Sequence, residues 1–195
     1  MAYFLQYNGN YLQVNGQYQS VKSILKNDFT SITIGTQTWM QYNLVEGGKT
    51  YENDEANRAN FGAMYTWSEI SNLNISGWRL PTLDDFYTLA AFVGETEGIT
   101  YGGTLKDTSL KYWRDVTGHT NSSGFSIRGA GYYQESIDTF SDLLNLTAFW
   151  TSTNMGDDTI GTPLFYANSD NVFYITAYSI NINSGDRVSA RLIHT

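Results

Sequence analysis

The sequence predicts an α+β fold with one main helix at about residues 83–93, many short strands and much loop. Three observations predict it. Apolar residues recur at helical spacing near the middle of the chain, two Asn-Gly pairs lie near the N-terminus, and apolar and polar residues alternate in the last third. With 195 residues, the chain is long enough to form one domain around a sizeable core.

The main helix is predicted directly after residues 77–82, GWRLPT. Pro81 disfavours helical backbone in the residue before it, and Thr82 is a good N-cap. Asp85 follows Thr82 at the spacing of a capping box, and Gly94 suits the left-handed position that ends many helices. The apolar residues at helical spacing are Phe86, Leu89, Ala90 and Val93. We therefore expect a rigid strand-to-helix corner in this part of the chain.

Residues 1–28 are predicted to form a separate small β-meander, and residues 29–195 the main domain. Asn-Gly, which favours two-residue hairpin turns, occurs at residues 8–9 and again at residues 15–16. Strands this short bury little surface, so the meander must pack on something else. It is either a flap on its own domain or an attachment arm that docks on a larger particle or a sister subunit. We favour the attachment arm.

The other predicted elements are short. The sequence predicts strands at residues 31–40, 125–133, 164–167, 171–183 and 188–193, and a loop or short helix at residues 138–147. Within the fourth of these strands the apolar residues change parity after Tyr178, which indicates a bulge or tight turn.

The composition excludes several classes of function. The formal net charge is −8 and only 11 residues are Lys or Arg, so nucleic acid is not an expected partner. The chain has no cysteine, which excludes disulfides, thiolate metal sites and thiol catalysis. No apolar run approaches the length of a membrane span, so membrane insertion is not expected. No basic and apolar leader is evident, as expected of an excised domain or of a protein that leaves its cell without the secretory pathway, as phage particles do.

The titratable residues form no catalytic pattern, and we expect neither a cofactor nor a metal ion. The charges that we predict to be solvated on loops are Glu95, Glu97, Asp157, Asp158 and His119. An alternative for the pair Asp157 and Asp158 is a calcium site, in which their carboxylate oxygens and those of Asp170 bind the ion.

Six short motifs, in order, resemble those of a known family. They are IGTQTWM with NL at residues 34–44, FGAMYTW at 61–67, GWRLPT at 77–82, GFS with GAGY at 124–132, FWTST at 149–153 and SAR at 189–191. Together they resemble the Fibrobacter succinogenes major paralogous domain family over roughly residues 31–193. That family is similar to a branch of the C-type-lectin-like fold shared with formylglycine-generating enzymes. The resemblance implies a C-type-lectin-like fold with short twisted antiparallel sheets and paired N- and C-terminal strands.

The resemblance also bears on activity. The oxidation chemistry of formylglycine-generating enzymes looks to depend on active-site cysteines, and this chain has none, so we expect binding and no catalysis. In related lectin-fold proteins encoded beside diversity-generating retroelements, the C-terminal region carries variable residues that contact the ligand. The residues that fit this pattern within 154–183 are Tyr166, Asn168, Asp170, Asn171, Tyr174, Tyr178, Asn181 and Asn183. The alternative is that these are ordinary outward-facing strand and loop residues.

We therefore expect a non-enzymatic receptor-binding protein of a phage particle, of the tail-fibre or head-fibre type, on the virion surface or otherwise extracellular. Its lectin-like surface would bind a glycan or protein of a host cell surface, and its N-terminal arm would bind other virion subunits. Fibre tips are commonly symmetric, so a homo-oligomer such as a trimer is expected. Two alternatives stay open: a structural decoration or adaptor protein of the virion, and a bacterial surface adhesin of the same fold.

Overall fold

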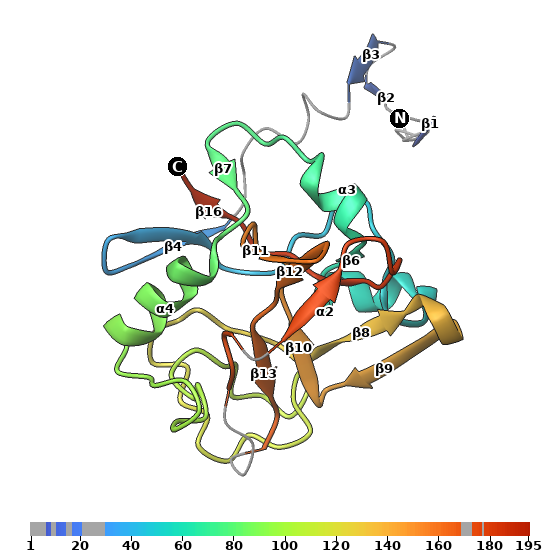
Figure 1. Ribbon diagram of the computed structural model, residues 1–195. Coiled ribbons are helices and arrows are strands. Elements are labelled where there is room, and N and C mark those ends of the chain that lie inside the picture. Colours follow the sequence, from blue (N-terminus) through green and yellow to red (C-terminus); the bar gives the residue numbers. More distant parts are fainter. Residues whose placement is uncertain (1–6, 9–10, 15–16, 21–29, 169–172, 177) are drawn as a thin grey trace.

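The computed structural model of the protein describes residues 7–8, 11–14, 17–20, 30–168, 173–176 and 178–195. Short helices and small sheets are joined by much loop in this part of the chain, which confirms the predicted α+β class (Figure 1). None of the described helices is long and apolar enough to cross a membrane.

The helices are α2 Arg58–Phe61, α3 Trp67–Ser71 and α4 Leu83–Phe92, with 3-10 turns η1 Tyr51–Asn53, η2 Glu55–Asn57 and η3 Glu135–Ile137. The strands of the main domain are β4 Ser31–Ile34, β5 Gln37–Met40, β6 Met64–Tyr65, β7 Trp78–Arg79, β8 Ala130–Gln134, β9 Thr139–Leu143, β10 Leu146–Ala148, β11 Asn154–Gly156, β12 Thr159–Gly161, β13 Leu164–Tyr166, β14 Ser179–Asn181, β15 Val188–Ser189 and β16 Ile193–His194.

The N-terminal region contains the predicted meander. The strands β1 Tyr7–Asn8, β2 Tyr11–Val14 and β3 Gln17–Ser20 form a three-stranded antiparallel sheet in that order. The rest of the predicted unit at residues 1–28 lies outside the described residues.

The longest described helix, α4, has the caps that its sequence predicts. Thr82 Oγ1 accepts the Asp85 N–H at 3.1 Å, and Asp85 Oδ2 accepts the Thr82 N–H at 2.7 Å, so the capping box is complete. Arg79 adds an ion pair with Asp85 at 2.7 Å. Gly94 follows the helix at φ 77°, a conformation that glycine adopts without strain. The buried side chains of α4 are Leu83, Phe86, Leu89 and Ala90.

The two ends of the main domain meet in one four-stranded sheet of order β4-β5-β16-β7 (Figure 1). Ile193 of β16 pairs with Trp39 of β5 and with Arg79 of β7. The prediction of one strand at residues 31–40 is wrong. This stretch is a hairpin, because the chain turns between β4 and β5 at Gly35, which has φ 60°.

A second four-stranded sheet has the order β13-β10-β8-β9. β10 is antiparallel to β13 and parallel to β8, and β8 is antiparallel to β9. The prediction of a loop or short helix at residues 138–147 is therefore wrong, because β9 and most of β10 lie in this stretch. Left-handed backbone at Asp142 and Leu144 breaks the regular alternation of side chains by which strands are recognised. The predicted strand at residues 125–133 begins only at β8, and the one at residues 188–193 is divided between β15 and β16 in different sheets.

The segment predicted as a strand at residues 171–183 is only partly one. Its regular part is β14, which pairs with β12 in a sheet of order β11-β12-β14. Tyr174 makes an isolated bridge to Leu164, and some residues of the segment lie outside the described part of the chain. Phe173 and Ile175 are buried, as their alternation predicts.

Two hydrophobic clusters fill the main domain. The larger members of the first, which joins α4 to the β4–β5 hairpin and to β13, are Trp39, Phe86, Trp113, Phe125, Phe149, Phe165 and Phe173. The larger members of the second, which joins β5, β6 and α3 to β15, are Met40, Leu44, Tyr65, Ile70, Trp150, Val188 and Leu192. Each fully buried large side chain contributes about 1.5–3 kcal/mol to stability, so these clusters hold the short elements together.

Candidate functional site

A pocket of about 290 Å³ lies on one face of the sheet β13-β10-β8-β9, beside β14 and β15. Its aliphatic lining consists of Leu146, Ala148, Leu164, Ile180 and Val188. Its aromatic lining consists of Tyr132, Tyr166 and Tyr178, and its polar lining of Gln134, Asp142 and Asp186. We call this site the tyrosine pocket.

Strand alternation produces the pocket face of the sheet. Successive side chains of a strand point to opposite faces. In β13, Leu164 and Tyr166 line the pocket, whereas Phe165 between them is buried in the first core cluster. In β8, Tyr132 and Gln134 line the pocket in the same way. One face of the sheet therefore packs into the first core cluster, and the other face carries the site, whose aliphatic lining also belongs to the second core cluster.

Asp142 reaches the pocket from an irregular backbone. It lies in β9 at φ 62°, next to Gly131 of β8 at φ 68°, and the pairing of the two strands skips both residues. A Cβ atom at Gly131 would clash with the Ser141 carbonyl oxygen, so only glycine fits there. Left-handed backbone is uncommon outside glycine, although aspartate adopts it more readily than most residues, and such positions are often found at functional sites. Asn145 Nδ2 donates to Asp142 Oδ1 at 2.9 Å and fixes the carboxylate.

The tyrosines of the C-terminal third lie close together. Burial raises the pKa of Tyr166, and the nearby phenols of Tyr178 and Tyr174 raise it further. The Tyr174 ring meets the Tyr166 ring edge-on, with centroids 6.5 Å apart. Tyr178 is 54% exposed. On the same pocket, Asp186 Oδ1 accepts the Glu135 N–H at 2.9 Å.

The structure brings two of the eight predicted ligand-binding residues into the pocket, Tyr166 and Tyr178, with Tyr174 in contact with the first. The predicted residues that do not line the pocket are Asn168, Asn181 and Asn183. Those outside the described residues are Asp170 and Asn171.

Sequence reasoning missed four polar or aromatic pocket residues. A signal existed for Tyr132 and Gln134, because alternation along the AGYYQ stretch puts them on one face. Local sequence carries no such signal for Asp142 and Asp186, since a backbone kink positions the first and a turn before β15 positions the second.

The carboxylates at residues 95 and 97 are structural, so the prediction that they are solvated is wrong. Glu97 Oε1 accepts the N–H groups of Ile175 at 2.6 Å and Thr176 at 2.8 Å, and Glu97 Oε2 accepts the Tyr87 hydroxyl at 2.7 Å. Glu95 is buried and accepts two backbone N–H groups of the loop that follows it. Because the Glu97 donors lie far away in sequence, local composition could not identify this role.

Acid is expected to release the segment that Glu97 holds. Burial by itself would raise the pKa of Glu97, but hydrogen bonds from Thr176, Tyr87 and Ile175 outweigh it and keep the pKa below its ordinary value of 4.5. The contribution to stability is therefore full above about pH 4.5 and is lost as the pH falls through the lower folded value. Protection of the Ile175 and Thr176 amides from hydrogen exchange should begin to fall below about pH 4.5 and should fall further as the pH is lowered.

The matched variant for this prediction is Glu97→Gln, which keeps the shape and loses the charge. It should reduce the protection of the same two amides at neutral pH by about 1 kcal/mol or more. Asp84→Asn, on the exposed side of α4, should leave them unchanged. If Glu97→Gln and Asp84→Asn gave equal protection, Glu97 would not hold this segment.

Two buried basic side chains lie against the end of β13. Lys106 Nζ donates to the Tyr166 carbonyl oxygen at 2.8 Å. The ring nitrogens of His119 lie 3.0 Å from the Asp107 carbonyl oxygen and 2.9 Å from the Ala167 carbonyl oxygen. The prediction of a solvated His119 is therefore wrong, because its loop folds inward and the ring holds the backbone. Burial lowers the pKa of both basic groups.

The described residues contain no group of three or more His, Asp or Glu side chains that could hold a metal ion. Asp157 and Asp158 form the turn between β11 and β12, at φ 49° and 55°. Asp170, the third expected ligand, lies outside the described residues, so the calcium alternative stays a prediction.

The motif segments interlock in the core around Arg191. Its Nε and Nη2 donate to Asn43 Oδ1 at 3.2 Å and 2.7 Å, and its Nη1 donates to the Phe125 carbonyl oxygen. Its guanidinium lies 5.5 Å from the centroid of the Phe149 ring. These contacts join four of the six motifs at one place in the core.

The other motifs are joined through residues 149–153. Trp150 Nε1 donates to the Tyr65 carbonyl oxygen at 2.6 Å. The Ser152 N–H donates to the Pro81 carbonyl oxygen at 2.8 Å. The six motifs therefore describe mainly one packed core, and Tyr132 at the end of the GAGY motif is their contribution to the tyrosine pocket.

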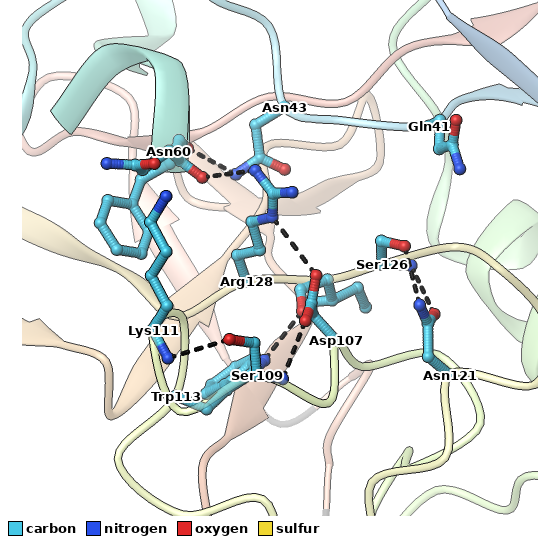
Figure 2. A network of polar contacts seen from close by, with 12 residues as sticks. Gln41, Asn43, Asn60, Asp107, Ser109, Lys111, Trp113, Asn121, Ser126 and Arg128 are labelled. Atoms are coloured by element: carbon cyan, nitrogen blue, oxygen red, sulfur yellow. Dashed lines mark hydrogen bonds and ion pairs between the residues drawn. The ribbon is translucent and has the colours of Figure 1, made fainter. Parts of the chain in front are cut away.

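A neighbouring polar network joins Asn43 to the loops before β8 (Figure 2). Arg128 Nη1 donates to the Asn60 carbonyl oxygen at 2.8 Å, and Arg128 Nε lies 3.6 Å from the Asp107 carboxylate. The Arg128 guanidinium also lies 3.8 Å from the centroid of the Tyr112 ring. The partners of Arg128 come from three separate segments of the chain, so the network holds the loops that carry them in place.

The geometry defines a class of protein: a small α+β domain whose end strands pair, with a tyrosine-lined pocket on one sheet face. The family model described as Fibrobacter succinogenes major domain matches residues 32–193, and the chain belongs to that family. No curated protein and no solved structure gives a significant match to the chain.

Proposed function

We propose that the main domain is a non-enzymatic ligand-binding module that binds a glycan or protein of a bacterial cell surface in the tyrosine pocket. The observation that carries this proposal is the lining, in which three tyrosines lie together with aliphatic residues and three polar side chains. Tyrosine rings supply rigid contact area for sugar rings and apolar groups, and a few polar groups fix the orientation of a ligand. The volume of about 290 Å³ is close to the usual range of ligand pockets.

We also propose that this module has a C-type-lectin-like fold. Two features support it. The strands β5 and β16, from the two ends of the domain, pair in one sheet, and one long helix, α4, packs on the core beside small sheets and long loops.

A finer proposal is that the module is displayed on the surface of a phage particle as a homo-oligomer such as a trimer, with the meander as its arm onto other virion subunits. What supports this role for the meander is that β1, β2 and β3 pair with one another in a sheet of their own. Antibodies to the main domain should label intact particles in electron micrographs. Labelling of bacterial envelopes alone would favour a cell-surface adhesin.

Tyr178→Ala is expected to weaken ligand binding about tenfold, because one well-placed aromatic contact contributes about 1 kcal/mol or more. Tyr178 is 54% exposed, so the change leaves the core intact. Fluorescently labelled protein would be titrated against bacterial capsular and cell-wall glycans and against intact bacteria.

The matched control is Tyr101→Ala, which removes a tyrosine that is 42% exposed and does not line the pocket. This variant should bind as the unmodified protein does. Equal binding by Tyr178→Ala and Tyr101→Ala would remove the pocket from the proposed function.

A further inference from the structure

We infer that the group recognised in the tyrosine pocket is an organic ammonium ion, either a quaternary amine or a protonated alkylamine, carried by the ligand. This inference rests on the proposed function, in which the pocket is the binding site. It follows from the charge and the aromatic character of the lining taken together.

The charged groups of the lining are both acidic. They are Asp142 and Asp186, and in the described part of the chain no Lys or Arg side chain lines the pocket. Each carboxylate uses its Oδ1 within the protein, where Asp142 accepts from Asn145 Nδ2 and Asp186 accepts from the Glu135 N–H, both at 2.9 Å. The second oxygen of each remains for a ligand or solvent, since no described residue donates to it. Two such carboxylates attract a cation and repel an acidic glycan.

The described cations next to the lining are engaged elsewhere. Arg187 follows Asp186 in sequence, but its Nη1 pairs with Glu69 at 2.6 Å. Lys106 donates to the backbone carbonyl of Tyr166 and does not line the pocket. The negative charge of the pocket is therefore not cancelled by a basic side chain within it.

The rest of the lining suits a cation with apolar substituents. The faces of aromatic rings are negative and attract ammonium groups, and Tyr132, Tyr166 and Tyr178 bring three such rings to one pocket. Aliphatic side chains from β10, β13 and β15 provide contact surface for methyl or methylene groups. A neutral sugar can use the rings and donate hydroxyl hydrogen bonds to the two carboxylates, but it leaves their negative charge unneutralised, whereas an alkylammonium group uses the rings and neutralises charge as well.

The backbone at Asp142 supports a role for its carboxylate. The residue is held at φ 62° beside Gly131, a conformation that costs free energy and is not needed to continue a strand. This free-energy cost is explained if the irregular backbone places the Asp142 carboxylate in the tyrosine pocket.

The test compares choline with 3,3-dimethylbutan-1-ol, which has the same shape with carbon in place of the charged nitrogen. Each would be titrated into the full chain at constant ionic strength, with amide chemical shifts as the readout. Choline should shift the amides of Tyr132, Tyr166 and Tyr178 saturably and bind about tenfold tighter than the alcohol.

Two charge-removing variants test the carboxylates. Asp142→Asn and Asp186→Asn each keep an acceptor oxygen for Asn145 Nδ2 or the Glu135 N–H, and asparagine tolerates the left-handed backbone at 142, so both should fold. Each should weaken choline binding severalfold and leave binding of the alcohol unchanged. Asp84→Asn, which removes a charge outside the pocket, should bind choline as the unmodified protein does.

The outcomes separate this inference from the proposed function. Equal affinity for choline and the alcohol, or choline binding that neither variant weakens, overturns the ammonium inference. The proposed function then survives if Tyr178→Ala still weakens binding to a glycan or to cells. If choline does not perturb the pocket and no member of the glycan and cell panel depends on Tyr178, both are wrong.

Discussion

Replacing Arg191 with methionine is expected to lower the free energy of unfolding by about 2 kcal/mol or more. Arg191 is 1% exposed, and no carboxylate of the described residues forms an ion pair with it. Burial, helped by the like charge of Arg128, lowers the pKa of Arg191 to about 9, so the group stays charged at neutral pH. Methionine fills similar space but leaves the oxygens of Asn43 and Phe125 without their donor. Each such buried acceptor costs about 1–3 kcal/mol.

Urea unfolding followed by tryptophan fluorescence would measure this loss. The control is Arg79→Met, which breaks the ion pair with Asp85 at a side chain that is 43% exposed. Pairs of that kind contribute about 0–1 kcal/mol. If Arg191→Met lost no more stability than Arg79→Met, the motif segments would not depend on Arg191.

Raising the pH from about 7 to about 10 is expected to stabilise the protein relative to its Lys106→Met variant by up to about 3 kcal/mol. Lys106 is fully buried, and burial lowers its pKa from 10.5 to about 8, although Glu95 and Asp115 offset part of this. Below the folded value the amine is charged in both states, so the folded state carries the whole desolvation cost. Above it the folded amine loses its proton while the unfolded amine keeps its own, and the cost disappears.

Unfolding free energies of both proteins across this pH range would test the prediction. Subtracting the variant removes the contributions of tyrosines, which titrate in both proteins. Lys111→Met, at an exposed lysine, should give the same pH dependence as the unmodified protein. Parallel pH profiles for Lys106→Met and the unmodified protein would contradict a lowered pKa of Lys106.

The parts of the fold that could be predicted depend on contacts close in sequence. The capping box of α4 joins residues three apart, and the alternation of Phe173 and Ile175 is visible in five residues. The parts that could not be predicted depend on backbone irregularities or distant partners. The hairpin at Gly35 looks like one strand because the alternation continues through its turn.

The same difference, between contacts close in sequence and contacts with distant partners, explains which residues of the tyrosine pocket could be predicted. Tyr166 and Tyr178 could be named because the resemblance to lectin-fold proteins with variable C-terminal residues pointed to the tyrosines and asparagines of this segment. Asp142 could not, because its place in the pocket depends on a kink shared with Gly131 of another strand. Glu97 appeared solvated for a related reason: its backbone donors lie 78 and 79 residues away.

The position of β16 between β5 and β7 has a consequence for biosynthesis. Until β16 leaves the ribosome, the edges of both neighbouring strands have nothing to pair with, and contacts between such distant segments form slowly. The nascent chain must therefore keep two unpaired edges apart from those of other chains while translation continues. Conditions that slow elongation should favour aggregation of this protein more than of one whose sheets are built from consecutive strands.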